Sequence, residues 1–171
     1  MNALDLLIQQ HRETDELFDD LKQARTQDKP ACFADLADAL VIHTVLEETR
    51  VYPTVLEKAD DELEEQLREA AEEHLGIKRY LADMLALDAD DPTFEAKLEV
   101  LEEQVKHHVK EEEREMFPRV AELFSRDVLE TLGEELETIS MQLTGTDPRL
   151  DLPKQTIRAA SVEGEGGKEA A

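Results

Sequence analysis

The sequence predicts an all-α protein: an up-down-up-down four-helix bundle with a short fifth helix and a flexible C-terminal tail. Charged residues make up 36% of the 171 residues and aromatic residues only 4%. This composition favours helices over strands, which are rich in aromatic and β-branched residues. The chain also contains an internal repeat, in which one pair of long helical segments is followed by a similar pair. Long helices joined by short turns pack as antiparallel neighbours.

The first half of the chain predicts two helices. Residues 2–27 carry one apolar stripe with a spacing of three and four residues, which is typical of a helix with one buried face. A turn that ends at Pro30 follows, and Pro30 suits the first turn of a second helix over residues 31–58. Pro53 lies inside this second pattern, where its missing N–H and its ring predict a kink or a break.

The second half repeats this arrangement. The turn 59–61 contains Asp residues, one of which is expected to cap a third helix over residues 62–87. The turn 90–92 places an acid before a Pro, a pattern typical of a helix start, and a fourth helix is expected over residues 93–124. Pro118 lies in this fourth helix and predicts the same perturbation as in the second.

A shorter fifth helix and a tail complete the chain. Ser125 can cap a helix over residues 126–143. Beyond it the composition changes to Gly, Pro and charged residues, which have little apolar surface to bury. We therefore divide the chain into a bundle domain, 1–144, and a flexible tail, 145–171. Within the tail, Leu150 to Ala160 is a candidate recognition peptide for a protein partner.

Charge and composition exclude several functional classes. The net charge of −24 argues against binding to nucleic acid, which needs a surface that neutralises phosphates, and against anionic membranes. Cys32 is the single cysteine, so no intrachain disulfide is expected and a cytoplasmic setting is favoured. The N-terminus lacks a basic segment followed by an apolar run, so no signal peptide is expected, and no apolar stretch is long enough to predict a membrane span.

Two stretches 65 residues apart carry the same motif. HTVLEETRVYP begins at His43 and HVKEEEREMFP begins at His108. In each, a Glu follows the His by four residues, and an aromatic residue and a Pro end the stretch. Residues at this spacing share one face of a helix, with Cβ atoms roughly 5–6 Å apart. The His and Glu of each motif can therefore bind the same metal ion. His11 and His74 add one His to the helix that precedes each motif.

The predicted helix bounds place these residues at one height in the bundle, within about seven residues or about 10 Å along the helix axis. All four His lie on apolar stripes and point inward. Buried carboxylates are costly unless they are paired or bound to metal, so the layer predicts a metal site. The alternative is a metal-free interaction bundle whose layer is satisfied by hydrogen bonds. The six candidate ligands are His11, His43, Glu47, His74, His108 and Glu112.

The ligand types limit the choice of metal. Imidazole and carboxylate suit iron, manganese or zinc, and no thiolate is present to favour a softer ion. Six ligands exceed the number that one tetrahedral zinc uses. Two metal ions fit better, with two His for each ion and Glu47 and Glu112 bridging them.

With these residues the chain resembles the hemerythrin-like (HHE cation-binding) family. The resemblance covers most of residues 1–124 and includes the aromatic-Pro pair after each motif. It implies a four-helix bundle with two non-haem iron ions, often oxo- or hydroxo-bridged. It also implies O2 binding, O2 or NO sensing, iron handling or peroxide breakdown. Oxygen-carrying hemerythrins have a second His four residues after the third-helix His, where this chain has Lys78.

This difference favours redox chemistry or sensing over oxygen carriage. We expect a non-haem di-iron protein that binds O2 or handles reactive oxygen species, by peroxide breakdown or iron oxidation. The alternative is a non-enzymatic sensor of O2, NO or iron, or an iron-binding protein, so the sequence leaves open whether the chain is an enzyme; it does not predict an oligomer. Tyr52 and Tyr80 are candidate proton donors, whereas His107 is expected outside the site and Lys78 in solvent.

Overall fold

The computed structural model describes residues 1–162, and within them all regular secondary structure is helical. The all-helical prediction is confirmed. The helices are α1 (Ala3–Gln23), α2 (Lys29–Leu46), α3 (Tyr52–Leu56), α4 (Asp61–Met84), α5 (Pro92–Glu111), α6 (Phe117–Leu123), α7 (Arg126–Leu143) and α8 (Leu152–Gln155). Two π-helical turns, η1 (Glu47–Val51) and η2 (Glu112–Met116), and a 3₁₀ turn, η3 (Pro148–Asp151), join some of them.

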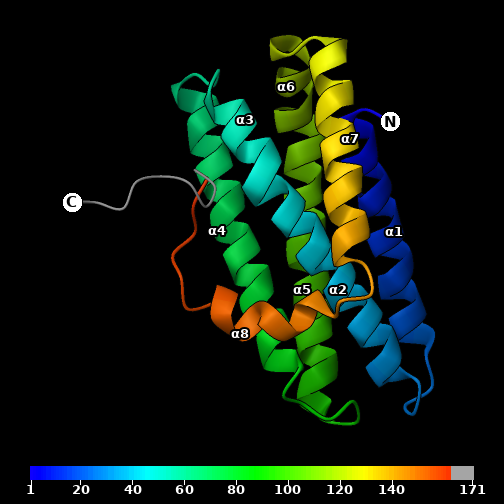
Figure 1. The fold of residues 1–171 in the computed structure, drawn as a ribbon. Helices are drawn as coiled ribbons and strands as arrows, with labels where there is room; N and C mark the ends of the chain where they lie inside the picture. The colour runs from blue at the N-terminus through cyan, green and yellow to red at the C-terminus, as the bar shows by residue number, and fades with distance from the viewer. Residues whose placement is uncertain (163–171) are drawn as a thin grey trace.

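The long helices lie side by side, and each runs opposite to the one before it (Figure 1). α2 continues through η1 into α3, and α5 continues through η2 into α6, so each of these pairs forms one long rod. α7 packs along α1 and α2. The fifth helix therefore covers the side of the molecule that the first two helices form.

Side-chain caps set the starts of α1, α4 and α5. The Asn2 side chain accepts a hydrogen bond from the Asp5 N–H, and Asp60 accepts one from the Leu63 N–H. Asp91 caps α5 in the same way, directly before Pro92 at the first helical position. These caps satisfy N–H groups that have no partner inside the helix. Ser125 also holds the N-cap position of α7, but its side chain makes no cap hydrogen bond.

The perturbation expected at each Pro is a π-helical turn. In η1 the Tyr52 N–H donates to the carbonyl of Glu47, five residues earlier, and in η2 the Phe117 N–H donates to the carbonyl of Glu112. Pro has no N–H, and its ring clashes with the carbonyl four residues before it. The wider turn accommodates this clash, so the helix at Pro53 widens and then continues. Such turns often occur at functional sites.

The apolar interior consists of two clusters, one toward each end of the bundle. On α1, Leu7 belongs to the first cluster and Phe18 to the second, and His11 lies between them. On α4, Leu67 belongs to the first cluster and Ile77 to the second, and His74 lies between them. A layer of polar side chains therefore crosses the middle of the bundle.

The segment after α7 differs from the flexible tail that the composition predicts. The side chain of Leu152 is fully buried, and Val162 is also buried. The Arg149 backbone N–H donates to Asp38 of α2, and its guanidinium pairs with the same carboxylate. One apolar anchor and one ion pair therefore dock residues 148–155 on the bundle. Residues 163–171 of the predicted tail lie outside the described residues. Among residues 1–162, no helix is both long enough and apolar enough to cross a membrane.

Candidate metal centre

The structure brings all six candidate ligands together in the layer between the two apolar clusters. Each is at least 95% buried. Four helical rods supply them: α1 and α4 carry one His each, and the rods with π-helical turns carry one His and one Glu each. The His side chains form two pairs. His11 Nε2 lies 3.2 Å from His43 Nε2, and His74 Nε2 lies 2.9 Å from His108 Nε2.

The two carboxylates connect these pairs. Glu47 Oε2 lies 3.2 Å from the Nε2 atoms of His43 and His74, one from each pair. Glu112 Oε2 lies 3.3 Å from the Nε2 of His11 and 3.4 Å from that of His108. Potential ligand atoms of the first pair and both Glu lie within 4.8 Å of one another, as do those of the second pair and both Glu. Each of these two groups, a His pair with both carboxylates, could hold a metal ion.

Unsatisfied oxygens support this fit. Among the residues that the structure describes, no hydrogen-bond donor satisfies Glu47 Oε1 or Glu112 Oε2, although both atoms are buried. Glu112 Oε2 is close to two imidazole nitrogens, but the angles do not make a hydrogen bond. A buried carboxylate oxygen without a partner is costly. A cation in the layer would satisfy both oxygens.

A side-chain oxygen outside the ligand set contacts the Nδ1 atom of each of the four candidate ligand His residues. In each case a side-chain oxygen lies 2.9–3.1 Å from Nδ1. The pairs are His11 with Glu113, His43 with Gln10, His74 with Glu48, and His108 with Glu73. An oxygen at this position accepts the Nδ1 proton, which fixes the ring and leaves the Nε2 lone pair for a metal.

The sequence reasoning missed these four outer residues, although the repeat contains a signal for them. Glu48 and Glu113 each directly follow a candidate ligand Glu. Gln10 directly precedes His11, and Glu73 directly precedes His74. Equivalent positions in the two halves therefore make the same contact, to the Nδ1 atom of a candidate ligand His. The signal is weak by itself because Asp and Glu make up 43 of the 171 residues.

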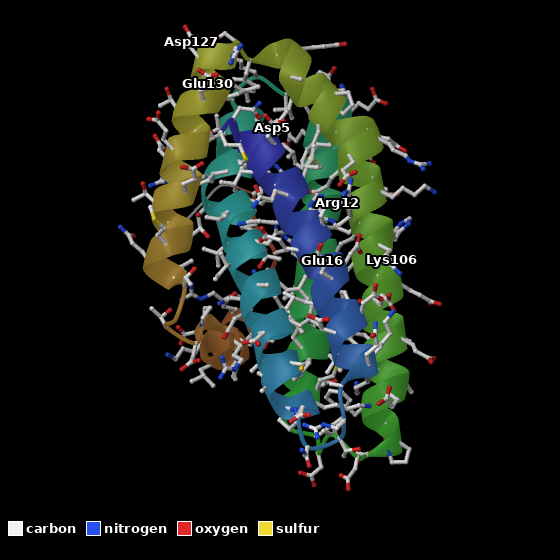
Figure 2. All side chains as sticks on the ribbon, turned by 90° about the vertical axis from the view of Figure 1, so that its right-hand side faces the viewer. Asp5, Arg12, Glu16, Lys106, Asp127 and Glu130 are labelled. Carbon is white, nitrogen blue, oxygen red and sulfur yellow. The ribbon has the colours of Figure 1, made fainter. Side chains whose placement is uncertain are left out.

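Lys78 contradicts its expected position in solvent. Its side chain is 6% exposed, and its Nζ lies 2.8 and 2.7 Å from the two oxygens of Glu48. Lys78 therefore fixes the position of the Glu48 carboxylate, which contacts His74 Nδ1. In the other half, a guanidinium nitrogen of Arg12 lies 2.7 Å from Glu113 Oε2. Arg12 is at the surface, on the face where α1 lies in front in Figure 2.

One of the two Tyr residues reaches the centre. The Tyr52 hydroxyl is fully buried and donates to Glu112 Oε1 at 3.0 Å; it also lies 3.3 Å from His74 Nε2. Its ring stacks on His74, and in the other half Phe117 stacks on His11. Burial, reinforced by the nearby carboxylates, raises the pKa of Tyr52 well above its usual value. Tyr80 instead packs on the second apolar cluster, under Lys97.

The charges of the layer shift the imidazole pKa values. Burial by itself lowers the pKa of His74, but hydrogen bonds and charge from Glu47 and Glu48 outweigh burial and raise it to about 9. Burial is likewise outweighed at His11, whose pKa is raised by the surrounding carboxylates. At His43 burial prevails, and the pKa is lowered. Without metal, the layer therefore holds protons that a binding cation must displace.

Known proteins share this sequence pattern and this fold. The hemerythrin HHE cation-binding domain matches residues 2–120. A DNA nickase from Nostoc sp. strain PCC 7120 is 25% identical over 144 residues, which are 84% of this chain. The chain spans only 40% of that relative's length.

A solved structure extends the comparison to three dimensions. The crystal structure of a hemerythrin HHE cation-binding domain-containing protein from Mycobacterium kansasii matches with a TM-score of 0.75. The match is 24% identical in sequence and covers 91% of this chain and 94% of that one, so the two proteins share a fold. Because the domain match spans most of the bundle and the buried His and Glu groups can hold metal, the chain belongs to the hemerythrin HHE cation-binding domain family.

Proposed function

We propose that this chain is a non-haem di-iron protein that binds O2 or handles reactive oxygen species, through peroxide breakdown or iron oxidation. The observation that carries the proposal is the ring of ligand atoms, in which two His pairs are connected by two carboxylates with unsatisfied oxygens. Imidazole and carboxylate together suit iron. When bound, the iron pair supplies redox and Lewis-acid chemistry toward O2 or peroxide.

The side chains around the centre have separate roles. His11 and His43 would hold one metal ion, His74 and His108 would hold the other, and Glu47 and Glu112 would offer a carboxylate to both. The outer oxygens fix the rings, and the two apolar clusters keep bulk water away from the layer. Among residues 1–162, Tyr52 is the one residue whose hydroxyl lies against both a candidate ligand carboxylate and a candidate ligand imidazole. It is therefore the proposed proton donor to a small oxygen ligand.

We further propose that residues 1–144 are the functional domain, an up-down-up-down four-helix bundle with α7 as its fifth helix. All six ligands, the four outer residues and Tyr52 lie within it. The docked segment that follows contributes no ligand among residues 145–162. A chain that ends at Thr144 should therefore still bind two metal ions.

Metal analysis combined with an optical spectrum tests the function. Protein expressed with added iron should contain two iron ions per chain and show a near-ultraviolet charge-transfer band. His74→Ala should lower the iron content, whereas His107→Ala, which removes an exposed His, should still allow two ions per chain. An iron content near zero with no band in the unmodified protein would contradict the proposal.

A second candidate function is sensing of O2, NO or iron without turnover. A cavity of about 470 Å³ lies against Glu48 and Lys78 and is lined on its other side by the C-terminal segment, including Lys154. Because Glu48 holds His74, a change at the centre has a physical route to that segment. Steady-state peroxide consumption separates the two functions: many turnovers per iron pair support the enzyme, and none supports the sensor.

A further inference from the structure

A third His-x-x-x-Glu pair lies on the surface of α5. His107 and Glu111 have the same spacing as the two buried pairs but are shifted by one residue, so they face outward. His107 Nε2 lies 3.3 Å from Glu111 Oε1 and 3.7 Å from Glu73 Oε1 of α4. Ligand atoms of the three residues lie within 4.8 Å of one another. One imidazole and two carboxylates are a suitable donor set for a divalent iron, manganese or zinc ion.

Glu73 belongs both to this surface cluster and to the buried centre. Its Oε2 lies 2.9 Å from His108 Nδ1, while its Oε1 faces His107. One carboxylate therefore contacts an exposed His on one side and a buried candidate ligand on the other. The surface cluster is one side chain away from the centre.

A small acidic cavity lies between α4 and α5 and is lined by residues of both regions. Its volume is about 70 Å³, enough for about two water molecules at roughly 30 Å³ each. Glu69, Glu73, Glu111 and Glu115 line it together with His108 and Glu112. Glu112 is 99% buried, and among the described residues no hydrogen-bond donor satisfies its Oε2. A candidate ligand carboxylate with one unsatisfied oxygen thus lines this cavity together with four acidic side chains.

Within residues 1–162, the other half of the repeat has apolar residues where this surface cluster lies. The positions equivalent to His107 and Glu111 are Ile42 and Leu46, and both are buried in the first apolar cluster. The position equivalent to Glu73 is Gln10, which is neutral. α7 packs over α1 and α2 on that side. The two halves hold matching ligands, but among residues 1–162 the α4–α5 side alone groups an exposed His with two carboxylates at ligand distances.

We propose that Glu73, His107 and Glu111 bind one divalent cation at the surface and pass it to the buried centre through the acidic cavity between α4 and α5. The proposal rests on the proposed function in one respect, because the destination must be a metal centre. The acidic surface concentrates cations at this face, and clefts lined by one sign of charge raise association rates by roughly 10- to 1,000-fold.

Uptake of Co²⁺ by the metal-free full-length protein tests the proposal, because Co²⁺ bound to His and carboxylate is coloured and stable in air. A His107→Ala/Glu111→Gln double variant should load the centre about tenfold more slowly at low ionic strength, although the centre itself should fill to the same final occupancy. The control is Glu122→Gln, which removes one charge at an exposed position on α6 and should load at the unmodified rate.

Equilibrium binding gives a second readout. With excess Co²⁺, the unmodified protein should bind one weakly held ion beyond those in the centre, and the double variant should not. Equal loading rates of the centre, together with an equal total of bound Co²⁺ at excess metal, would overturn the proposal. Failure of the proposed function would be distinct, because the centre would then take up no Co²⁺ in any protein. In that case the unmodified protein would still bind one weakly held Co²⁺ at the surface cluster, and the double variant would not.

Discussion

Tyr52 is the residue at which the two halves of the centre differ most. It occupies the position that Phe117 holds in the second half, and both rings stack on a candidate ligand His. Its hydroxyl contacts Glu112 and His74, so the half of the centre around His74 has a proton donor. The half around His11 has only the apolar ring of Phe117.

Tyr52→Phe should therefore lower peroxide turnover by about 100-fold or more, which is typical for loss of a general acid. The iron content should remain two per chain because the ligands are unchanged. Tyr80→Phe is the matched control and should keep full turnover, since Tyr80 lies in the second apolar cluster. Equal turnover in the two variants would exclude Tyr52 as the proton donor.

Lys78 is the buried cation nearest the centre, and its removal should be costly. Lys78→Met leaves the half-buried Glu48 carboxylate without its ammonium partner. We expect a loss of about 1–3 kcal/mol in the free energy of unfolding of the metal-free protein, measured by urea denaturation. Lys106→Met removes an exposed ion pair to Glu102 and should change stability by less than about 0.5 kcal/mol. Similar losses in both variants would show that burial of the pair is unimportant.

The six candidate ligands could be predicted from the sequence because spacing and repetition identify them. His43 and Glu47 recur as His108 and Glu112 at a fixed offset, and a random arrangement of acids does not reproduce that offset together with the aromatic-Pro pair. The outer residues could not be predicted in this way. Glu73 and Glu113 resemble many surface acids, and only the packed structure shows which ones reach a ring nitrogen.

At the scale of the element, the π-helical turns orient the site. In a regular α-helix, residues five apart point about 140° away from each other. The π turn η1 brings Glu47 and Tyr52, which are five apart, to the same side, with 3.5 Å between Glu47 Oε2 and the Tyr52 hydroxyl. The sequence predicted a disturbance at Pro53 because Pro cannot donate a hydrogen bond. It could not predict the π form, because a kink, a break and a widened turn all relieve the same clash.

The docking of α7 depends on a glycine. A Cβ on Gly133 would lie 2.2 Å from the carbonyl oxygen of Met1 and 2.9 Å from the backbone nitrogen of Ala3. Gly133→Ala should force α7 away from α1 and lower the free energy of unfolding by about 1–3 kcal/mol, measured by urea denaturation.

Gly76 on α4 provides a control of opposite sign. A Cβ there would meet nothing within 4 Å, so Gly76→Ala should stabilise the protein by about 0.5–1 kcal/mol through higher helix propensity. If both substitutions stabilised the protein, the close approach of α7 to the N-terminal residues would be unimportant.

At the scale of the whole molecule, stability of the metal-free protein should depend on pH. The pKa of His74 in the folded state is about 9, above the ordinary value of about 6.5 that applies to an unfolded chain. Because the folded state binds this proton more tightly, His74 stabilises it fully below about pH 6.5. That stability is lost as the pH rises to about 9, and the raised pKa of His11 acts in the same direction.

We therefore expect the melting temperature of the metal-free protein to fall between about pH 6.5 and pH 9. Calorimetry across this range measures the effect, to which the raised pKa of His74 by itself contributes about 3 kcal/mol. The protein loaded with metal should show a weaker dependence, since the cation replaces the protons. A melting temperature that rises over this range in the metal-free protein would contradict the raised pKa of His74.

The polar layer also has a consequence for folding cooperativity. It separates the apolar interior into two clusters, each with its own large side chains, so in the absence of metal each end of the bundle can open as its own unit. Amide hydrogen exchange of the metal-free protein should show two levels of protection, one for each end, and metal should merge them into one. The bound ions would then couple the two apolar clusters, so that both ends of the bundle unfold together as one cooperative unit.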